Sequence, residues 1–218
     1  MLSRSILPAL AALFSFAAAS FSGEATYYGG NTQGGACSFS TYTLPSGLYG
    51  TALSDSNWDN SEACGGCVQV TGPTGKNITA MVTDQCPGCG QNHLDLYENA
   101  FPELAAKSAG HIQVTWDWVE CPISSPLEIH MKSGVSAYWF SAQVVNGNKR
   151  TASMSVSTDG GSTWKDGLTR KTYNFFENSS GFGTTTVDVR VESEDGDRVI
   201  VKNVAVTGDS KTTASGNY

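Results

Sequence analysis

Six cysteines, all within the first 121 residues, restrict the fold of this chain more than any other feature of its sequence. Four of them form two Cys-x-x-Cys pairs, at 64/67 and 86/89, and eighteen residues lie between the pairs. This spacing is within the range of a zinc ribbon. An even number of cysteines in a short span is equally typical of a disulfide framework, for which six cysteines allow fifteen pairings. Metal ligation and disulfide bonding are therefore the two alternatives.

The N-terminus favours the disulfide alternative. Arg4 is followed by an apolar run over residues 6–16 and by small residues at 17–20, which is the pattern of a secretory signal peptide covering residues 1–20. The run is too short to anchor the chain in a membrane, which takes about 20 apolar residues. We therefore expect a secreted, extracellular protein with no membrane partner, and disulfides form in such oxidising compartments.

Composition excludes one class of partner. The 218 residues contain 13 Lys and Arg against 20 Asp and Glu, a net charge of −7. A protein of this charge is poorly suited to nucleic acid, which attracts clustered cations. Charged residues make up 15%, below the average of about 25%, and there are 24 glycines. These values are typical of a turn-rich β protein.

Charge and cysteine content divide the mature chain into two parts. Residues 21–123 hold ten acids and two lysines, a net charge of −8, whereas ten acids and ten bases follow residue 124. Residues 121–126 contain two prolines and make a short connector. We predict one domain over 21–123, a second over 124–209, and a polar, frayed tail over 210–218.

Alternating apolar and polar residues predict strands in both parts. Residues 154–157, 187–191 and 199–206 alternate, and Gly-containing turns separate them, which indicates a small antiparallel β-sandwich. In the first part, residues 68–70 and 78–83 read as strands. One or two helical turns are expected within 97–107.

The chain resembles expansins of the microbial, fungal kind. Seven motifs come in the expansin order: Gly-Glu-Ala-Thr-Tyr-Tyr-Gly-Gly at 23–30, Gly-Gly-Ala-Cys at 34–37, Ala-Leu-Ser at 52–54, Cys-Gly-Gly-Cys at 64–67, Val-Thr-Asp-Gln-Cys-Pro-Gly-Cys at 82–89, His-Leu-Asp-Leu at 93–96 and Val-Glu-Cys-Pro at 119–122. The resemblance implies an all-β protein, with a six-stranded double-psi β-barrel followed by an immunoglobulin-like β-sandwich that binds carbohydrate. It also implies the disulfides Cys37–Cys64 and Cys67–Cys121, which leaves Cys86 and Cys89 to each other.

The resemblance places a polysaccharide groove on the barrel, with Asp84 and Asp95 as its carboxylates and Thr26 and Tyr28 beside them. Strand alternation directs Asp95 away from the core, because leucines flank it. Without the resemblance, Asp84 reads as a turn residue and Asp95 as a solvated carboxylate. Many expansins have an aromatic residue shortly after the first aspartate, where this chain has Gln85-Cys86.

On the second domain the resemblance implies a flat cellulose-binding surface made by Tyr138, Trp139 and Tyr173, with Lys132 beside it. Aromatic planes bind the C–H faces of sugar rings. Neighbouring strand residues point to opposite faces, so we expect Phe140 in the core, Trp139 exposed, and Tyr138 exposed through a twist or bulge. The tryptophans at 58, 116, 118 and 164 are expected to be structural.

These features predict a non-hydrolytic wall-loosening protein that acts on plant or fungal cellulose and associated glucans as a monomer. An endoglucanase with the same barrel and a passive, barwin-like binding protein are the alternatives. Asp95 matches the acid of the related endoglucanases, but the stretch that would carry their base, residues 26–31, has no carboxylate, and only Asp84 remains as a substitute.

No cofactor or metal is expected, since the histidines at 93, 111 and 130 are scattered along the chain. The sequons at Asn77 and Asn178 are candidate glycosylation sites in a eukaryotic secretory route.

Overall fold

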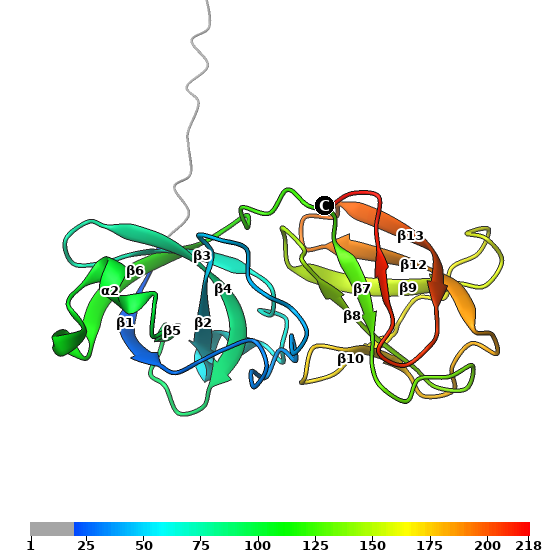
Figure 1. The fold of residues 1–218 in the computed structure, drawn as a ribbon, viewed down its shortest axis with the longest axis horizontal. Coiled ribbons are helices and arrows are strands. Elements are labelled where there is room, and N and C mark those ends of the chain that lie inside the picture. The colour runs from blue at the N-terminus through cyan, green and yellow to red at the C-terminus, as the bar shows by residue number, and fades with distance from the viewer. Residues whose placement is uncertain (1–19) are drawn as a thin grey trace, which may run out of the picture.

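The computed structural model describes residues 20–218, so all of the expected signal peptide except Ser20 lies outside the described residues. Within the described part, no helix is long and apolar enough to cross a membrane. Two β domains lie side by side along the longest axis, and the chain crosses from one to the other between β6, which ends at Val119, and β7, which begins at Glu128 (Figure 1).

The first domain, called the barrel, is a closed barrel of six strands in the order β1-β5-β2-β4-β3-β6. Two neighbouring pairs are parallel, β1 with β5 and β2 with β4, and the others are antiparallel. The strand bounds are β1 Phe21–Tyr28, β2 Tyr49–Ser54, β3 Cys67–Thr71, β4 Asn77–Cys86, β5 Leu94–Tyr97 and β6 Ile112–Val119.

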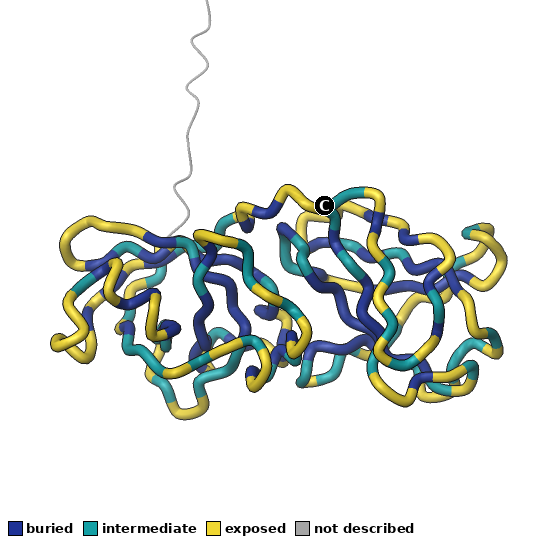
Figure 2. Tube along the Cα trace, viewed as in Figure 1, coloured by how far each residue is buried: buried dark blue, intermediate teal, exposed yellow. Residues whose placement is uncertain are grey.

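The alternation of apolar residues decides which side chains fill the barrel. In β5, Leu94 and Leu96 are fully buried, while Asp95 between them is only half-buried, as the pattern predicts. Figure 2 shows the buried inner strands and the exposed loops around them. The helices are short: α1 Asp55–Trp58, α2 Phe101–Leu104 and the 3-10 turn η1 Lys107–Ala109. The helical turn expected within 97–107 is therefore present as α2, whose Phe101 and Leu104 pack into the core.

The second domain, called the sandwich, packs a five-stranded sheet, β10-β11-β8-β7-β14, against a three-stranded sheet, β13-β12-β9. Its apolar residues form a second core, separate from that of the barrel. The predicted strands at 154–157, 187–191 and 199–206 correspond to β9, β12 and β13, the last of which ends at Ala205. The strand bounds are β7 Glu128–Met131, β8 Phe140–Val145, β9 Thr151–Ser157, β10 Thr169–Arg170, β11 Phe176–Asn178, β12 Thr186–Ser193, β13 Arg198–Ala205 and β14 Lys211–Thr213.

The C-terminal tail differs from its prediction. Residues 210–218 were expected to fray, but β14 pairs with β7 and forms the edge of the five-stranded sheet. After it, Leu127 donates to the Gly216 carbonyl, and the Tyr218 hydroxyl bonds to that of Thr151 at 2.8 Å. Polar composition failed to reveal this segment because its stability comes from backbone pairing, which any residue except proline can supply.

The disulfides are Cys37–Cys64, Cys67–Cys121 and Cys86–Cys89, the pairs that the resemblance implied. All six sulfurs are therefore engaged, and the zinc-ribbon alternative is wrong. The first two bridges span 27 and 54 residues, and loops of this size are stabilised by about 2–4 kcal/mol each. The bridge at Cys37 holds the loop of residues 33–41, called the junction loop, against the barrel.

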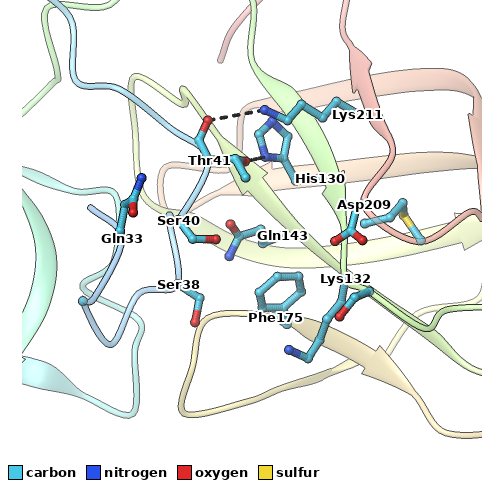
Figure 3. A pocket seen from close by; sticks show the side chains of 13 residues that line it. Gln33, Ser38, Ser40, Thr41, His130, Lys132, Gln143, Phe175, Asp209 and Lys211 are labelled. Atoms are coloured by element: carbon cyan, nitrogen blue, oxygen red, sulfur yellow. Dashed lines mark hydrogen bonds between the residues drawn. The ribbon is translucent and has the colours of Figure 1, made fainter. Parts of the chain in front are cut away.

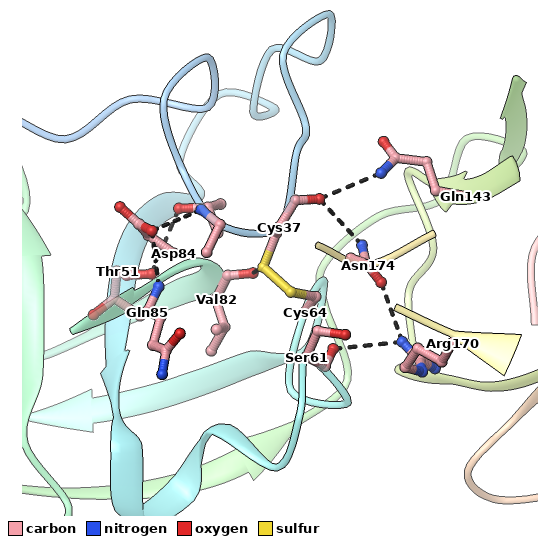
Figure 4. The surroundings of a disulfide bond; sticks show 12 residues. Cys37, Thr51, Ser61, Cys64, Val82, Asp84, Gln85, Gln143, Arg170 and Asn174 are labelled. Atoms are coloured by element: carbon pink, nitrogen blue, oxygen red, sulfur yellow. Dashed lines mark hydrogen bonds between the residues drawn. A yellow bond between two sulfur atoms is a disulfide. The ribbon is translucent and has the colours of Figure 1, made fainter. Parts of the chain in front are cut away.

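The junction loop and the five-stranded sheet meet across the domain boundary. Thr41 lies with its hydroxyl 3.3 Å from His130 Nδ1, and its carbonyl accepts from Lys211 Nζ at 3.3 Å (Figure 3). On the other side of the loop, the Cys37 carbonyl accepts from the amides of Gln143 and Asn174, both at 3.3 Å (Figure 4).

Most of the groups at this boundary are buried: Cys37 is 0%, Gln143 2% and Asn174 5% exposed. Ser61 is also buried, and its hydroxyl donates to the Lys171 carbonyl at 2.8 Å. Water would replace these partners if the domains separated, so each hydrogen bond contributes about 0.5–1.5 kcal/mol to the association of the two domains. The barrel and the sandwich are therefore joined by direct contacts as well as by the connector.

Candidate functional site

Asp84 and Asp95 lie on the two strands that flank β2. Asp84 of β4 and Asp95 of β5 are both register partners of Ala52, so all three side chains share one face. Neighbouring strands are about 4.8 Å apart, which places the two aspartate Cα atoms about 10 Å apart across β2. The barrel thus brings together two carboxylates from different strands, as the groove prediction requires.

Asp95 has one engaged and one open oxygen. Its Oδ1 accepts from the Thr26 hydroxyl at 2.6 Å, because Thr26 is its register partner on β1. The same hydroxyl lies 2.8 Å from Nε2 of His93. Within residues 20–218, Asp95 Oδ2 has no hydrogen-bond partner, and the side chain is half-buried. This oxygen is available to accept a hydrogen bond from a ligand hydroxyl.

Asp84, in contrast, accepts three hydrogen bonds. Its Oδ1 accepts from the backbone N–H groups of Ala36 at 2.7 Å and Gln85 at 2.8 Å, and its Oδ2 from the Tyr28 hydroxyl at 3.1 Å. Burial, and next to it the nearby Asp84 carboxylate, raise the pKa of Tyr28 well above its usual range, so that its hydroxyl stays a donor. Because Ala36 is in the junction loop, Asp84 also ties that loop to the barrel wall (Figure 4).

The expected aromatic surface of the sandwich is present in part. Tyr138 is 79% exposed, and Phe140 is fully buried, as predicted. Trp139, which was expected to be exposed, is half-buried and packs against the sandwich core. The reason is a tight turn in which Ser136 and Trp139 exchange backbone hydrogen bonds, so that Tyr138 projects from the tip while the indole folds back.

Tyr173 and Lys132 lie together, as the prediction has them. The Lys132 ammonium is 5.3 Å from the centroid of the Tyr173 ring and 5.2 Å from that of Phe175. The Tyr173 hydroxyl donates to Glu177 at 2.5 Å, and this bond is the main cause that raises the pKa of Tyr173 to about 12. The phenol is therefore held in one position, with its ring available for contact.

Comparisons with known proteins identify the family. Expansin-like protein 1 of Dictyostelium discoideum is 31% identical over 187 residues, covering 82% of this chain and 64% of that protein. Expansin-YoaJ of Bacillus subtilis is 34% identical over 173 residues, covering 78% of this chain and 72% of that protein. The chain belongs to the expansin family. It spans just under two thirds of the Dictyostelium expansin and almost three quarters of the Bacillus one.

Solved expansin structures agree in fold. Apo-expansin from Clavibacter michiganensis matches with a TM-score of 0.81 and 30% identity, covering 91% of this chain and 98% of that one. A mutant of the same bacterial expansin in complex with cellohexaose matches with a TM-score of 0.81 and 29% identity over the same shares. The fold is therefore the expansin one, a double-psi β-barrel followed by a β-sandwich. A family model described as lytic transglycolase matches residues 50–116 of the barrel.

Three contacts around Asp84 and Asp95 did not follow from the sequence. His93 contacts Thr26, and the alternation of His93-Leu94-Asp95 would have placed it on the same face as Asp95. Gln85, which stands near the position of the usual aromatic residue, donates from Nε2 to Asp55 at 2.6 Å. The junction loop carries no side-chain signal, because it reaches Asp84 through the Ala36 backbone.

The candidate glycosylation sites differ in accessibility. Asn77 is exposed at the start of β4. Asn178 is half-buried, and its Nδ2, the atom that would carry a glycan, donates to the Gly181 carbonyl at 2.9 Å. Within residues 20–218, no group of three or more His, Cys, Asp or Glu side chains is arranged to hold a metal ion.

Proposed function

We propose that this expansin is a secreted, non-hydrolytic protein that binds cellulose and associated glucans and loosens their noncovalent contacts. Family members are typically extracellular or cell-wall proteins and are generally considered non-hydrolytic. The observation that carries the proposal is the open Oδ2 of Asp95 beside Thr26 in a barrel that contacts the sandwich directly. The sandwich anchors the protein through Tyr138 and Tyr173, and the barrel acts on the glucan.

The chemistry of loosening follows from this arrangement. Cellulose chains associate through hydroxyl hydrogen bonds and apolar stacking. A carboxylate accepts a hydroxyl more strongly than a neutral oxygen does, because charge-assisted hydrogen bonds are about twice as strong. Asp95 Oδ2 can therefore compete for a glucan hydroxyl that would otherwise bond to a neighbouring chain. One polypeptide supplies every group of this surface, which is compatible with action as a monomer.

The geometry argues against hydrolysis with inversion. Such hydrolysis needs an acid and a base with carboxyl groups about 6.5–9.5 Å apart, and the base must bind a water. No carboxylate occurs in residues 26–31. Asp84 already accepts from Ala36, Gln85 and Tyr28, so at most one of its about four acceptor sites remains for a water.

Cellulose weakening and sugar release, measured together, test the proposal. Wild-type protein is expected to increase the creep of cellulose-rich walls, or to weaken filter paper, without a rise in reducing ends. Asp95→Asn is expected to abolish loosening while the fold and cellulose binding stay nearly unchanged, because the amide still accepts from Thr26. Asp59→Asn, an exposed site on the same domain, removes the same charge and serves as the matched control.

An enzyme remains the second candidate, because the matching family model is described as lytic transglycolase. A hydrolase and a lytic transglycolase both cleave the glucan chain and create new chain ends, whereas a loosening protein does not. Sustained release of soluble sugars that Asp95→Asn abolishes would refute the non-hydrolytic proposal. Binding without creep or chain cleavage would instead identify a passive wall-binding protein.

A further inference from the structure

A pocket of about 310 Å³ lies between the junction loop and the five-stranded sheet. One wall consists of the junction-loop residues Gln33, Ser38 and Ser40, and the other of Lys132, Gln143 and Phe175 (Figure 3). The pocket is distinct from the carboxylates of the barrel and from the exposed Tyr138. Its volume is at the lower end for ligand pockets, which suits one or two sugar rings rather than an oligosaccharide.

The polar side chains that line the mouth of the pocket form no hydrogen bonds with other described residues of the protein. Within residues 20–218, the side chains of Gln33, Ser38, Ser40 and Asp209 make no hydrogen bond, and Lys132 Nζ contacts only aromatic rings. These groups are solvated in the free protein, so a ligand hydroxyl can replace the water on each of them. They offer donors and acceptors at several points around one small space.

The charge of the pocket favours a neutral ligand. Lys211 also lines it, but its ammonium donates to the Thr41 carbonyl. The positive charge of Lys132 is balanced by the negative charge of Asp209 on the same wall. The His130 ring nitrogens contact Thr41 and Glu128, and the other polar side chains of the lining are amides and hydroxyls. A phosphate or sulfate site would have several unpaired cations. Amides, hydroxyls and one aromatic ring match the hydroxyls and the apolar C–H groups of a sugar.

Contacts between the two domains border the pocket. Gln143 donates to the Cys37 carbonyl there, and Thr41 contacts His130, so the two domains touch. A polysaccharide main chain cannot pass through such a space. Only a chain end or a side branch can enter it.

The position of the pocket selects the branch. The junction loop connects to Asp84 through Ala36 and to Asn174, next to Tyr173, through the Cys37 carbonyl. The pocket therefore lies between the barrel carboxylates and the aromatic rings of the sandwich. A glucan that contacts both regions lies across the junction loop and presents its branches, not its ends, to the pocket.

We propose that this pocket binds a single-ring sugar branch of a β-glucan whose main chain lies along the barrel and sandwich surfaces. The inference rests on the proposed function, since it extends that surface to a branched substrate. It predicts that a branched β-glucan is bound more tightly than an unbranched one. Gln33, Ser40 and Asp209 are then specificity-determining residues.

Calorimetric titration with two matched oligosaccharides tests this preference. The probes are cellotetraose and cellotetraose that carries xylose branches, so the main chain and its ends are the same in both. We expect wild-type protein to bind the branched probe at least about tenfold more tightly, as two or more added hydrogen bonds would give. Ser40→Phe, which fills the pocket from an exposed position, is expected to remove this preference and leave cellotetraose binding unchanged.

Two further variants keep the test decisive. Gln33→Ala, also at an exposed position, is expected to weaken binding of the branched probe alone, about three- to tenfold, as the loss of one hydrogen bond would. Ser215→Phe makes the same substitution as Ser40→Phe at an exposed site beyond the other end of β14, and it is expected to retain the wild-type preference. Circular dichroism verifies that each variant is folded.

Equal affinity of wild-type protein for the two probes would overturn the inference. So would a preference that survives both Ser40→Phe and Gln33→Ala, or an equal loss of both probes in Ser40→Phe, which would place the main chain or its end in the pocket. Any of these results, with cellulose binding and creep intact, leaves the proposed function standing. Absence of cellulose binding by the wild-type protein would refute the proposed function itself.

Discussion

Truncation of Asp84 and of Asp95 should have very different effects on stability. Asp84→Ala removes three hydrogen bonds, and one of them holds the junction loop to the barrel through Ala36. Asp95→Ala removes only the bond from Thr26, whose hydroxyl keeps its contact with His93. The two variants lose the same charge from the same domain. A difference between them therefore reports on the hydrogen bonds.

The expected magnitudes follow from the number of bonds. A hydrogen bond to a charged group contributes about 1.5–3 kcal/mol, and both side chains are half-buried, so water recovers part of that loss. At about 1 kcal/mol for each bond, Asp84→Ala lowers the free energy of unfolding by about 3 kcal/mol and Asp95→Ala by about 1 kcal/mol. For a chain of this length these values correspond to decreases in Tm of about 6–12 °C and 2–4 °C.

Thermal unfolding followed by circular dichroism measures both values. Asp84→Asn provides the matched control, because its amide oxygen can still accept from Ala36 and Gln85, and we expect it to recover most of the lost stability. Equal Tm values for Asp84→Ala and wild-type protein would refute the reasoning. A loss in Asp95→Ala as large as that in Asp84→Ala would refute it as well.

Three other perturbations have defined outcomes. Tyr138→Ala should weaken binding to insoluble cellulose by about 1 kcal/mol without a change in Tm, because Tyr138 is exposed. Trp139→Ala should lower both the affinity and the Tm, because Trp139 packs against the core. Depletion isotherms measure the affinity, and thermal melts measure the Tm. Burial lowers the pKa of His130, so the contribution of its neutral ring to stability is present above pH 6.5 and is lost as the pH falls through the lowered pKa. In melts from pH 7 to 5, the Tm of His130→Gln should therefore decrease less than the Tm of wild-type protein. After expression in a eukaryotic secretory host, mass spectrometry should find Asn77 more fully glycosylated than Asn178, and the reverse order would contradict the accessibility argument.

Local patterns predicted the local part of the fold. The sequence Leu94-Asp95-Leu96 gave the correct faces for all three side chains, because alternation depends only on strand geometry. In the structure, Ile123 belongs to the core of the barrel and Leu127 to the core of the sandwich. The motif order supplied the disulfide pairing, which the spacing of the cysteines alone left open.

The tertiary structure decided what lies opposite each of these residues. Asp84 and Asp95 both face Ala52, and Thr26 faces Asp95, although 69 residues separate that last pair. Alternation assigns a side chain to a face of its own strand but does not choose the neighbouring strand. That choice depends on closure of the whole barrel.

The same limit explains the three features that the sequence concealed. Trp139 is half-buried because a turn folds its ring onto the core of the sandwich. The tail forms β14 because β7 offers it a free edge. The pocket beside the junction loop exists only because two domains dock through backbone carbonyls such as that of Cys37. The sequence determined which groups were available, since composition and alternation are local properties. Their partners were decided only in the folded chain, because burial and hydrogen bonding are satisfied across the whole structure at once.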